Sequence, residues 1–322
     1  MRSAFKSAIL LLVFIQFSAC VKELIPANNG YKPSVVIWSI LNADSNITVV
    51  SSGNRGIDQK DVVNISSLDF FLFEDSIKVA TLYSQSITSD RQLHVFNYRP
   101  KPNKKYILRL FNQSFDISAS IQMVSTLPKY DSIEVSKGES SYLRYTLTDQ
   151  SGTDDAYQFD VNMYNIGDLI DTSNNTLIQS NFVYKKRFDK YDEPSLNYNF
   201  PILNPTQQDE FTFPVNDNLF DGKKKTFLFL LSNPVSKTIN VPRTVTGDVA
   251  VSDQLNSTKR YAVIRCRKIS PEYYQFYTSE SNNNSIFGTP YFNPTNVYSN
   301  IKGGLGLMAS KVERVDTVWL IK

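Results

Sequence analysis

From Ser34 onward, the chain alternates between short runs of β-branched and aromatic residues and clusters of polar turn residues such as Ser51–Asn54. Runs of this kind predict β-strands. The predicted strands are Val35–Trp38, Ile47–Val50, Phe70–Phe73, Tyr106–Leu110, Tyr142–Leu147, Tyr157–Met163, Phe211–Phe213, Phe227–Leu231 and Val315–Leu320. Because no helical period appears in the first half, the pattern predicts an all-β (mainly β) chain built from β-sandwiches.

A hinge at Leu127–Tyr130, which contains Pro128, divides these strands into two groups. We therefore expect two immunoglobulin-like β-sandwich domains, an N-terminal one over residues 34–128 and a C-terminal one over residues 129–322. The stretch Asp168–Pro205 is polar and rich in Asn, Asp and Tyr. It is predicted to form long loops of the second domain, where binding surfaces tend to lie.

One short helix near the C-terminus, at about residues 270–281, interrupts the β pattern. Ser270 is suited to the cap position, Pro271 to the first helical position and Glu272 to the positive end of the helix dipole. The spacing of Tyr273, Phe276 and Tyr277 predicts an aromatic face that packs on a sheet.

The N-terminus has the features of a secretory signal peptide over residues 1–19: a basic start, an apolar run and the small residues Ser18 and Ala19. Phe17-Ser18-Ala19-Cys20 resembles the bacterial lipobox, which implies cleavage before Cys20. The resemblance also implies diacylglycerol on the Cys20 sulfur and a fatty acyl chain such as palmitate on the new amino terminus. Residues 20–33 would then be the lipidated cysteine and a tether. An ordinary signal peptide or a short buried helix, with Cys20 incidental, is the alternative.

Charge and hydropathy narrow the possible partners. Removing residues 1–19 removes two of the 34 basic residues and none of the 31 acidic ones, so the mature side chains carry a net charge of +1. A balanced surface gives no reason to expect nucleic acid as a partner. No later segment reaches the roughly 18 apolar residues that span a bilayer, so attachment to outer-membrane lipid is expected to depend on Cys20.

Residues for common hydrolytic or zinc chemistry are scarce. His94 is the only histidine, and its place in a strand, on the face opposite Leu93 and Val95, predicts a surface or half-buried side chain rather than a catalytic base. One histidine and Cys266 do not provide a usual zinc ligand set. Cys266 shares a strand face with Ala262 and Ile264 and is predicted to be a small buried hydrophobe, the alternative being a reactive thiol.

No carboxylate pair stands out for glycoside hydrolysis, and Gly303–Gly306 is predicted to be a tight turn rather than a nucleotide-binding loop. Two oxygen-rich stretches, Asp149–Asp155 and Asn216–Gly222, have a composition suited to calcium, but neither matches the twelve-position calcium loop. Asx turns explain both stretches, and a structural calcium ion is the lesser alternative. We therefore expect no cofactor, no catalytic residue and no metal ligand.

Exposed tyrosines next to Asn and Asp could bind a glycan or a peptide, because each ring offers a flat apolar face beside hydrogen-bonding groups. Tyr184, Tyr191 and Tyr198 in the irregular stretch are the candidate ligand contacts. Packing of these rings beneath the loops explains the same pattern.

The C-terminal quarter carries a distinctive series: Ile269–Tyr274, the turn Phe287–Pro290 and Val297–Gly306. Together with Asp131-Ser132-Ile133 and Leu219–Lys223, this order resembles the Bacteroidota outer-membrane lipoprotein family known as domain of unknown function 4249. Met308 departs from the family pattern, which usually has an aromatic residue there. The resemblance implies a two-part β-sandwich lipoprotein whose gene often lies beside a TonB-dependent outer-membrane transporter. It implies no reaction and no catalytic residues.

These observations favour a non-enzymatic lipoprotein of the outer membrane that captures ligand for, or assists, a TonB-dependent nutrient uptake system. A location on the cell surface is expected ahead of a periplasm-facing one. The alternatives are a structural or adhesive β-sandwich protein of the cell surface and, after it, an enzyme.

Overall fold

The computed structural model describes residues 34–54, 65, 68–79, 82–88, 91–127, 130–136, 141–187, 214–218, 220–231, 238–242, 252–284 and 297–321. Over these residues the chain is mainly β, with one short helix, α2 (Pro271–Asn284), near the C-terminus. The prediction of a β-rich chain with a helix near 270–281 is therefore confirmed. The predicted strand Phe211–Phe213 lies outside the described residues. No helix among the described residues is long and apolar enough to cross a bilayer.

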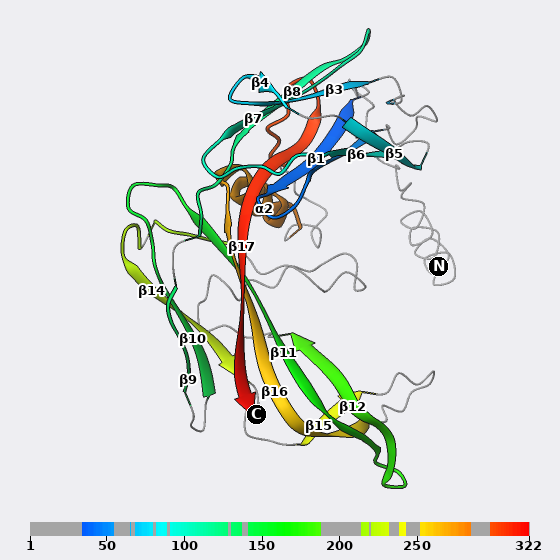
Figure 1. The fold of residues 1–322 in the computed structure, drawn as a ribbon, viewed down its shortest axis with the longest axis vertical. Helices are drawn as coiled ribbons and strands as arrows, with labels where there is room; N and C mark the ends of the chain where they lie inside the picture. The colour runs from blue at the N-terminus through cyan, green and yellow to red at the C-terminus, as the bar shows by residue number, and fades with distance from the viewer. Residues whose placement is uncertain are drawn as a thin grey trace, which may run out of the picture.

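The largest sheet has ten strands (Figure 1). They are β1 (Val35–Asn42), β2 (Ile47–Gly53), β5 (Leu82–Thr88), β6 (Arg91–Phe96), β11 (Ala156–Asp171), β12 (Thr176–Arg187), β13 (Val215–Asn216), β15 (Thr238–Pro242), β16 (Ser252–Ile269) and β17 (Leu305–Ile321). Eight of them follow the order β12-β11-β16-β17-β1-β2-β6-β5, while β13 pairs with β11 and β15 pairs with β16. The first and last strands, β1 and β17, pair in parallel, so this pairing joins the two ends of the described chain.

Two smaller sheets cover parts of the large one. A four-stranded sheet contains, in order, β4 (Ile77–Lys78), β3 (Asp69–Glu74), β7 (Lys105–Phe111) and β8 (Asp116–Gln122). A three-stranded sheet contains β14 (Lys224–Leu231), β10 (Ser141–Thr148) and β9 (Tyr130–Ser136).

Each small sheet encloses its own hydrophobic core against the large sheet. The first core joins residues of β1, β2 and β6, such as Ile37 and Val49, to residues of the four-stranded sheet, such as Leu108. The second core joins β11 and β16 to the three-stranded sheet around Phe159 and Phe227. Leu127, the first residue of the predicted hinge, packs against both cores.

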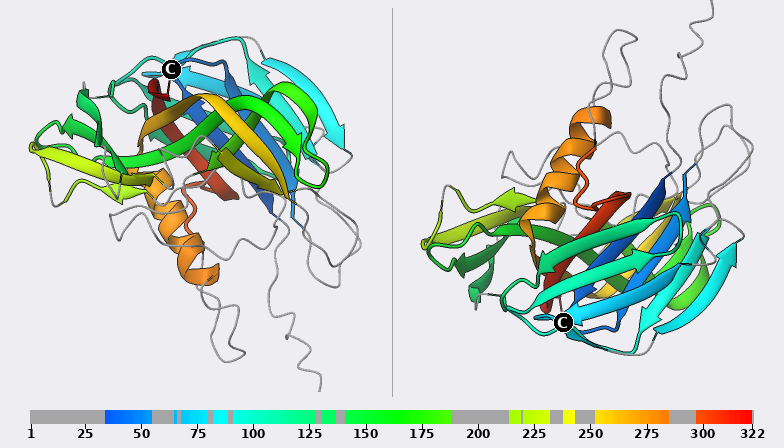
Figure 2. Two further views of the ribbon diagram at one scale, coloured as in Figure 1. Left: turned by 90° about the horizontal axis from the view of Figure 1, so that it is seen from below. Right: turned by 90° about the horizontal axis from the view of Figure 1, so that it is seen from above.

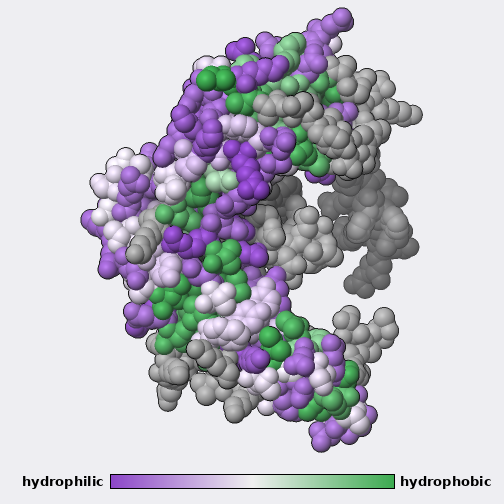
Figure 3. Space-filling model, viewed as in Figure 1, coloured by the Kyte–Doolittle hydropathy of each residue, from purple (hydrophilic) through white to green (hydrophobic). Residues whose placement is uncertain are grey.

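One continuous sheet thus serves both cores, and the described strands do not form two clearly separate immunoglobulin-like sandwiches. Strands β16 and β17 are 18 and 17 residues long. At roughly 3.3 Å per residue each spans more than 50 Å, which is enough to reach from one core to the other. In Figure 1, β17 runs from the four-stranded sheet at the top to the C-terminus at the bottom. On the face shown in Figure 3, hydrophobic residues form small patches among hydrophilic ones.

Helix α2 packs on one side of the large sheet (Figure 2). Tyr273 of the helix contacts a cluster that includes Ile269 of β16 and Leu307 and Ala309 of β17, with Phe276 and Tyr277 packed against it. The predicted aromatic face is therefore confirmed. The backbone oxygen of Ser270 accepts hydrogen bonds from the amides of Tyr273 and Tyr274, at 3.0 and 3.1 Å. The side-chain hydroxyl of Ser270, in contrast, accepts a hydrogen bond from the Ser310 amide of β17, at 3.2 Å.

The turn predicted at Gly303–Gly306 is shorter in the structure: Gly303, with a φ of 75°, and Gly304 precede β17, whereas Leu305 and Gly306 already belong to that strand. Gly306 has a φ of 110°, and a Cβ there would lie 1.9 Å from the Ile37 carbonyl oxygen of β1. Only glycine allows β1 and β17 to approach so closely at this position.

The prediction of irregular loops across Asp168–Pro205 is wrong for its first half. Residues up to Asp171 continue β11, and a turn containing Asn175, whose φ is 56°, leads into β12. Strand β12 lies at the edge of the large sheet, where its side chains are mostly exposed. Phe182 and Tyr184 of this strand pack against a small cluster, but its other hydrophobic residues follow no regular alternation that would have distinguished the strand from a loop. Residues 188–205 lie outside the described residues.

Candidate functional site

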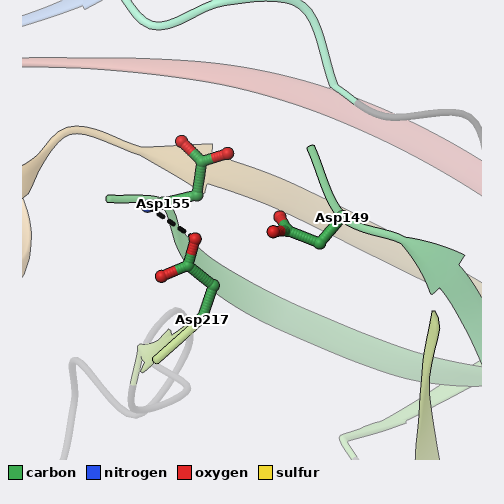
Figure 4. A group of neighbouring side chains, drawn as sticks. All are labelled: Asp149, Asp155 and Asp217. Atoms are coloured by element: carbon green, nitrogen blue, oxygen red, sulfur yellow. Dashed lines mark hydrogen bonds between the residues drawn. The ribbon is translucent and has the colours of Figure 1, made fainter. Parts of the chain in front are cut away.

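The two oxygen-rich stretches lie side by side in the fold. Asp149–Asp155 connects β10 to β11, and Asn216–Gly222 connects β13 to β14. Pairing of β13 with β11 places Asn216 opposite Ala156, and pairing of β10 with β14 places Thr148 opposite Lys224. Because β13 is paired with β11 and β14 with β10, the β10–β11 and β13–β14 connections lie next to each other. Asp149, Asp155 and Asp217 are buried, with carboxylate oxygens within 4.8 Å of one another (Figure 4). We call these three residues the aspartate cluster.

Protein donors hold each carboxylate in place. Asp217 accepts a hydrogen bond from the Asp155 amide at 2.9 Å. Asp149 accepts from the Tyr157 hydroxyl at 2.5 Å and from the Gly222 amide at 3.0 Å. The hydroxyl of Thr153 donates to Asp155 at 2.9 Å.

Lys268 supplies the positive charge next to the aspartate cluster. Its side chain is only 2% exposed and forms an ion pair with Asp155. The same ammonium group donates to the Ser125 hydroxyl at 2.7 Å. Ser125 belongs to the segment between the two cores, so Lys268 ties that segment to the loops beside the second core.

Helix α2 also contacts this region. Asn216, next to Asp217, donates a hydrogen bond from its amide nitrogen to the Tyr274 hydroxyl of the helix at 3.1 Å. The aspartate cluster therefore lies at a junction of five parts: the β10–β11 connection, the β13–β14 connection, the inter-core segment, the end of β16 and helix α2.

Three carboxylates beside one ammonium group leave an excess of two negative charges if all are ionised. Burial raises the pKa of Asp217, and the charges of Asp149 and Asp155 act in the same direction. Calcium takes about six to eight oxygen ligands, and Asp149, Asp155 and Asp217 are the residues that could hold one. Lys268 and the hydroxyl and amide donors already occupy positions around these oxygens, so the cluster has protein partners of its own.

The residues sought for catalysis do not form a reactive site. His94 is 2% exposed, so the prediction of a surface or half-buried side chain is wrong. It does lie opposite Leu93 and Val95, but that face points into the first core, where its ring stacks on Phe70 at 3.6 Å. Its Nε2 is 2.9 Å from the Ser51 hydroxyl, and burial lowers the pKa of His94 to about 4. A serine–histidine pair enclosed in a core offers no access to substrate.

The other predicted residues have different outcomes. Cys266 is 1% exposed in the second core, as predicted, and burial raises its pKa to about 12. Tyr184 lies on β12 and packs against a small cluster of Leu169, Val241 and Leu255. Phe17, Ser18, Ala19 and Cys20, together with Tyr191 and Tyr198, lie outside the described residues.

Sequence reasoning missed Lys268, although a signal was present. Alternation along β16 places residue 268 on the same face as Ile264 and Cys266, which point into the second core. A lysine on a buried strand face requires a buried anionic partner. Continuing the alternation from Cys266 to residue 268 would have placed Lys268 on the buried face and predicted a buried anionic partner for it.

Comparisons with known proteins identify a family and little else. The model of a family described as "Domain of unknown function (DUF4249)" matches residues 22–314. No curated protein matches the chain. A crystal structure of a DUF4785 family protein from Legionella pneumophila subsp. pneumophila str. Philadelphia 1 is similar over 73% of this chain, at 11% sequence identity and a TM-score of 0.24. The chain covers 52% of that protein.

Proposed function

This chain belongs to the DUF4249 family, whose description assigns no activity, and we propose that it is a non-enzymatic lipoprotein anchored in the outer membrane through Cys20. We propose that it serves a TonB-dependent uptake system of a Bacteroidota cell, by capturing ligand or by assisting the transporter. The observation that carries the proposal is the signal-like N-terminus ending in Phe17-Ser18-Ala19-Cys20. The immunoglobulin-like character of the two units and the cell-surface location stay predictions within it.

The architecture supports binding rather than chemistry. Among the described residues, the histidine is enclosed in the first core, and the aspartate cluster is filled by protein donors. Long strands shared by two cores give a scaffold that would hold exposed surfaces at a fixed position relative to a membrane anchor.

Lipid attachment is tested by growing cells with an alkyne-tagged fatty acid and detecting the tag on the protein. Wild-type protein and a Cys266→Ser variant should carry the tag, whereas Cys20→Ser should not. A tag retained in Cys20→Ser, or absent from the wild type, would remove the basis of the proposal.

The role in uptake is tested by affinity purification from membranes extracted with mild detergent. An outer-membrane transporter should copurify with the wild type and be lost with Cys20→Ser. Proteinase treatment of intact cells should degrade the protein while a periplasmic control stays intact. A deletion that impairs attachment to surfaces but leaves nutrient uptake unchanged would favour the structural or adhesive alternative.

A further inference from the structure

Three aromatic side chains form a row across the long sheet, on the face opposite the second core. Tyr164 of β11 lies opposite Tyr261 of β16, which lies opposite Trp319 of β17. Their sequence neighbours Ala262 and Met163 point into the second core, so the three rings point away from it. The ring centroids of the two tyrosines are 5.0 Å apart with nearly parallel planes, and those of Tyr261 and Trp319 are 5.1 Å apart. Trp319 is 47% exposed. We call these residues the aromatic row.

A group of polar side chains follows the aromatic row on the same face. Asp160 lies opposite Arg265, with charged atoms 3.6 Å apart, and accepts a hydrogen bond from the Asn162 amide nitrogen at 3.0 Å. The Oδ1 of Asn162 and the Nε of Arg265 are buried and have no hydrogen-bond partner among the described residues. Burying a polar atom without a partner is unfavourable, so one acceptor and one donor remain unsatisfied here.

Charge on this face is largely compensated. Beyond Asp160 and Arg265, Arg267 forms an ion pair with Glu313, and further along the same face β17 is covered by α2. Two basic residues of the edge strand β12 also lie beside the site, Lys185 opposite Tyr164 and Arg187 opposite Asn162. The paired charges of β11, β16 and β17 themselves give little attraction for a strongly anionic or cationic ligand.

We propose that the aromatic row and the polar group next to it bind a neutral oligosaccharide. Flat aromatic rings present a negative face to the C–H groups of a sugar ring, and each sugar hydroxyl both donates and accepts. The Asn162 oxygen and the Arg265 Nε are enclosed in the unliganded protein, so the Arg265 side chain, which is 36% exposed, would have to turn outward for a sugar hydroxyl to reach them. Two strand spacings of about 4.8 Å make the row roughly 10 Å long, which matches about two sugar rings.

An extended peptide fits this face less well. Peptides that bind sheets usually pair with the free backbone groups of an edge strand. The rings of Tyr164 and Tyr261 instead lie over β11 and β16, whose backbone groups pair with neighbouring strands on both sides. Strand β17 pairs with β1 only up to Lys311, so at Trp319 it pairs with β16 alone among the described strands, and a peptide could pair there only beside the row, not across it. Recognition across the row must come from side chains, which suits a ligand rich in hydroxyl groups.

The inference names the site and ligand class for the ligand-capture form of the proposed function, and its test uses the protein alone. The full mature chain with Cys20→Ser would be titrated with hexaoses of β-linked glucose, xylose and mannose and of α-linked glucose. Trp38 and Trp319 are the two tryptophans of the chain, so a Trp38→Phe variant reports on Trp319 fluorescence alone. We expect at least one hexaose to bind and to change that fluorescence.

Matched variants then locate the site. Trp319→Ala should weaken binding about tenfold, which corresponds to about 1.4 kcal/mol, because the exposed ring that would contact the sugar is lost. Trp319→Phe, which keeps a flat ring, should retain most of the affinity. Trp38→Phe changes a similarly half-exposed tryptophan that packs on Phe276 of α2, and it should leave the affinity unchanged.

Two results would overturn the inference: no binding of any hexaose at millimolar concentration, or equal affinity in Trp319→Ala and the wild type. In the second case the row would only stabilise the sheet, as cross-strand aromatic pairs commonly do. Either failure leaves the fatty-acid labelling and transporter copurification unaffected, so the proposed function and the glycan site are tested separately.

Discussion

Replacing Lys268 with methionine would remove the only ammonium group paired with the aspartate cluster among the described residues. The substitution keeps a long unbranched side chain, so the loss is mainly one of charge and hydrogen bonding. Lys268 is 2% exposed, with Asp155 and the Ser125 hydroxyl as partners of its ammonium group. Breaking a buried ion pair on one side typically costs about 3–5 kcal/mol, because the remaining charge stays buried. For a chain of this size, that cost corresponds to a fall in Tm of roughly 5–8 °C.

The assay is thermal and urea unfolding of the full mature chain, followed by both circular dichroism and tryptophan fluorescence. Two probes are needed because a protein with two cores can unfold in more than one step. Lys259→Met is a matched control: it makes the same change at an exposed position of the same strand. We expect this control to alter stability by less than about 0.5 kcal/mol.

The pH dependence separates loss of charge from loss of packing. Burial raises the pKa of Asp217, and protonation of this carboxylate removes uncompensated negative charge, so the stability deficit of Lys268→Met should shrink as the pH falls from neutral to mildly acidic values. A deficit below about 1 kcal/mol at neutral pH, or a deficit equal at both pH values, would refute the interpretation that Lys268 balances the charge of the cluster.

Three further predictions concern single positions. Because the pKa of Asp217 is raised in the folded state, its contribution to stability is present at low pH and is lost as the pH rises through that pKa. Asp217→Asn, which keeps an acceptor for the Asp155 amide, should therefore raise stability at neutral pH by an amount on the order of 1 kcal/mol, as measured by urea unfolding. A wild-type Tm that rises with added calcium but not in this variant would show instead that the cluster binds a cation. The Cys266 thiol, buried and with a pKa raised to about 12, should react with a thiol reagent only after denaturation, and rapid labelling of native protein would contradict this. Gly306→Ala should cost about 2 kcal/mol or more in urea unfolding, because its Cβ would lie 1.9 Å from the Ile37 carbonyl oxygen, and a change under 0.5 kcal/mol would contradict that contact.

The sequence predicted correctly those elements that depend on interactions between residues close together in the chain. The helix beginning at Pro271, the turn before β17 and the buried face of Ala262, Ile264 and Cys266 all follow from the residues of those segments. His94 was misplaced because alternation shows which residues share a face but not which face is buried. On β6 the buried face carries His94 and Phe96, and the histidine occupies a position that usually holds an apolar residue.

Long-range pairing could not be predicted in the same way. Parallel pairing of β1 with β17 brings together residues more than 260 positions apart, such as Val36 and Leu305, and no local pattern encodes it. Because β1 pairs with β17, the strands expected to form two separate sandwiches belong to one shared sheet. The aspartate cluster has the same origin, since Asp149 and Asp217 meet only because β10 pairs with β14 and β11 with β13.

The shared sheet also connects the aspartate cluster to the proposed ligand site. Strand β16 carries Lys268 at one end, Arg265 beside the open polar group and Tyr261 in the aromatic row, all within eight residues. Lys268 points toward the second core and Tyr261 away from it, so one strand fixes both the junction and the exposed face. A rigid junction would limit how far the aromatic row can move relative to the first core, and hence relative to the membrane anchor proposed at Cys20. If Lys268→Met loosens the junction without unfolding the second core, hexaose affinity should stay unchanged while copurification of a transporter falls, because the ligand face is built within one sheet but its placement depends on both cores.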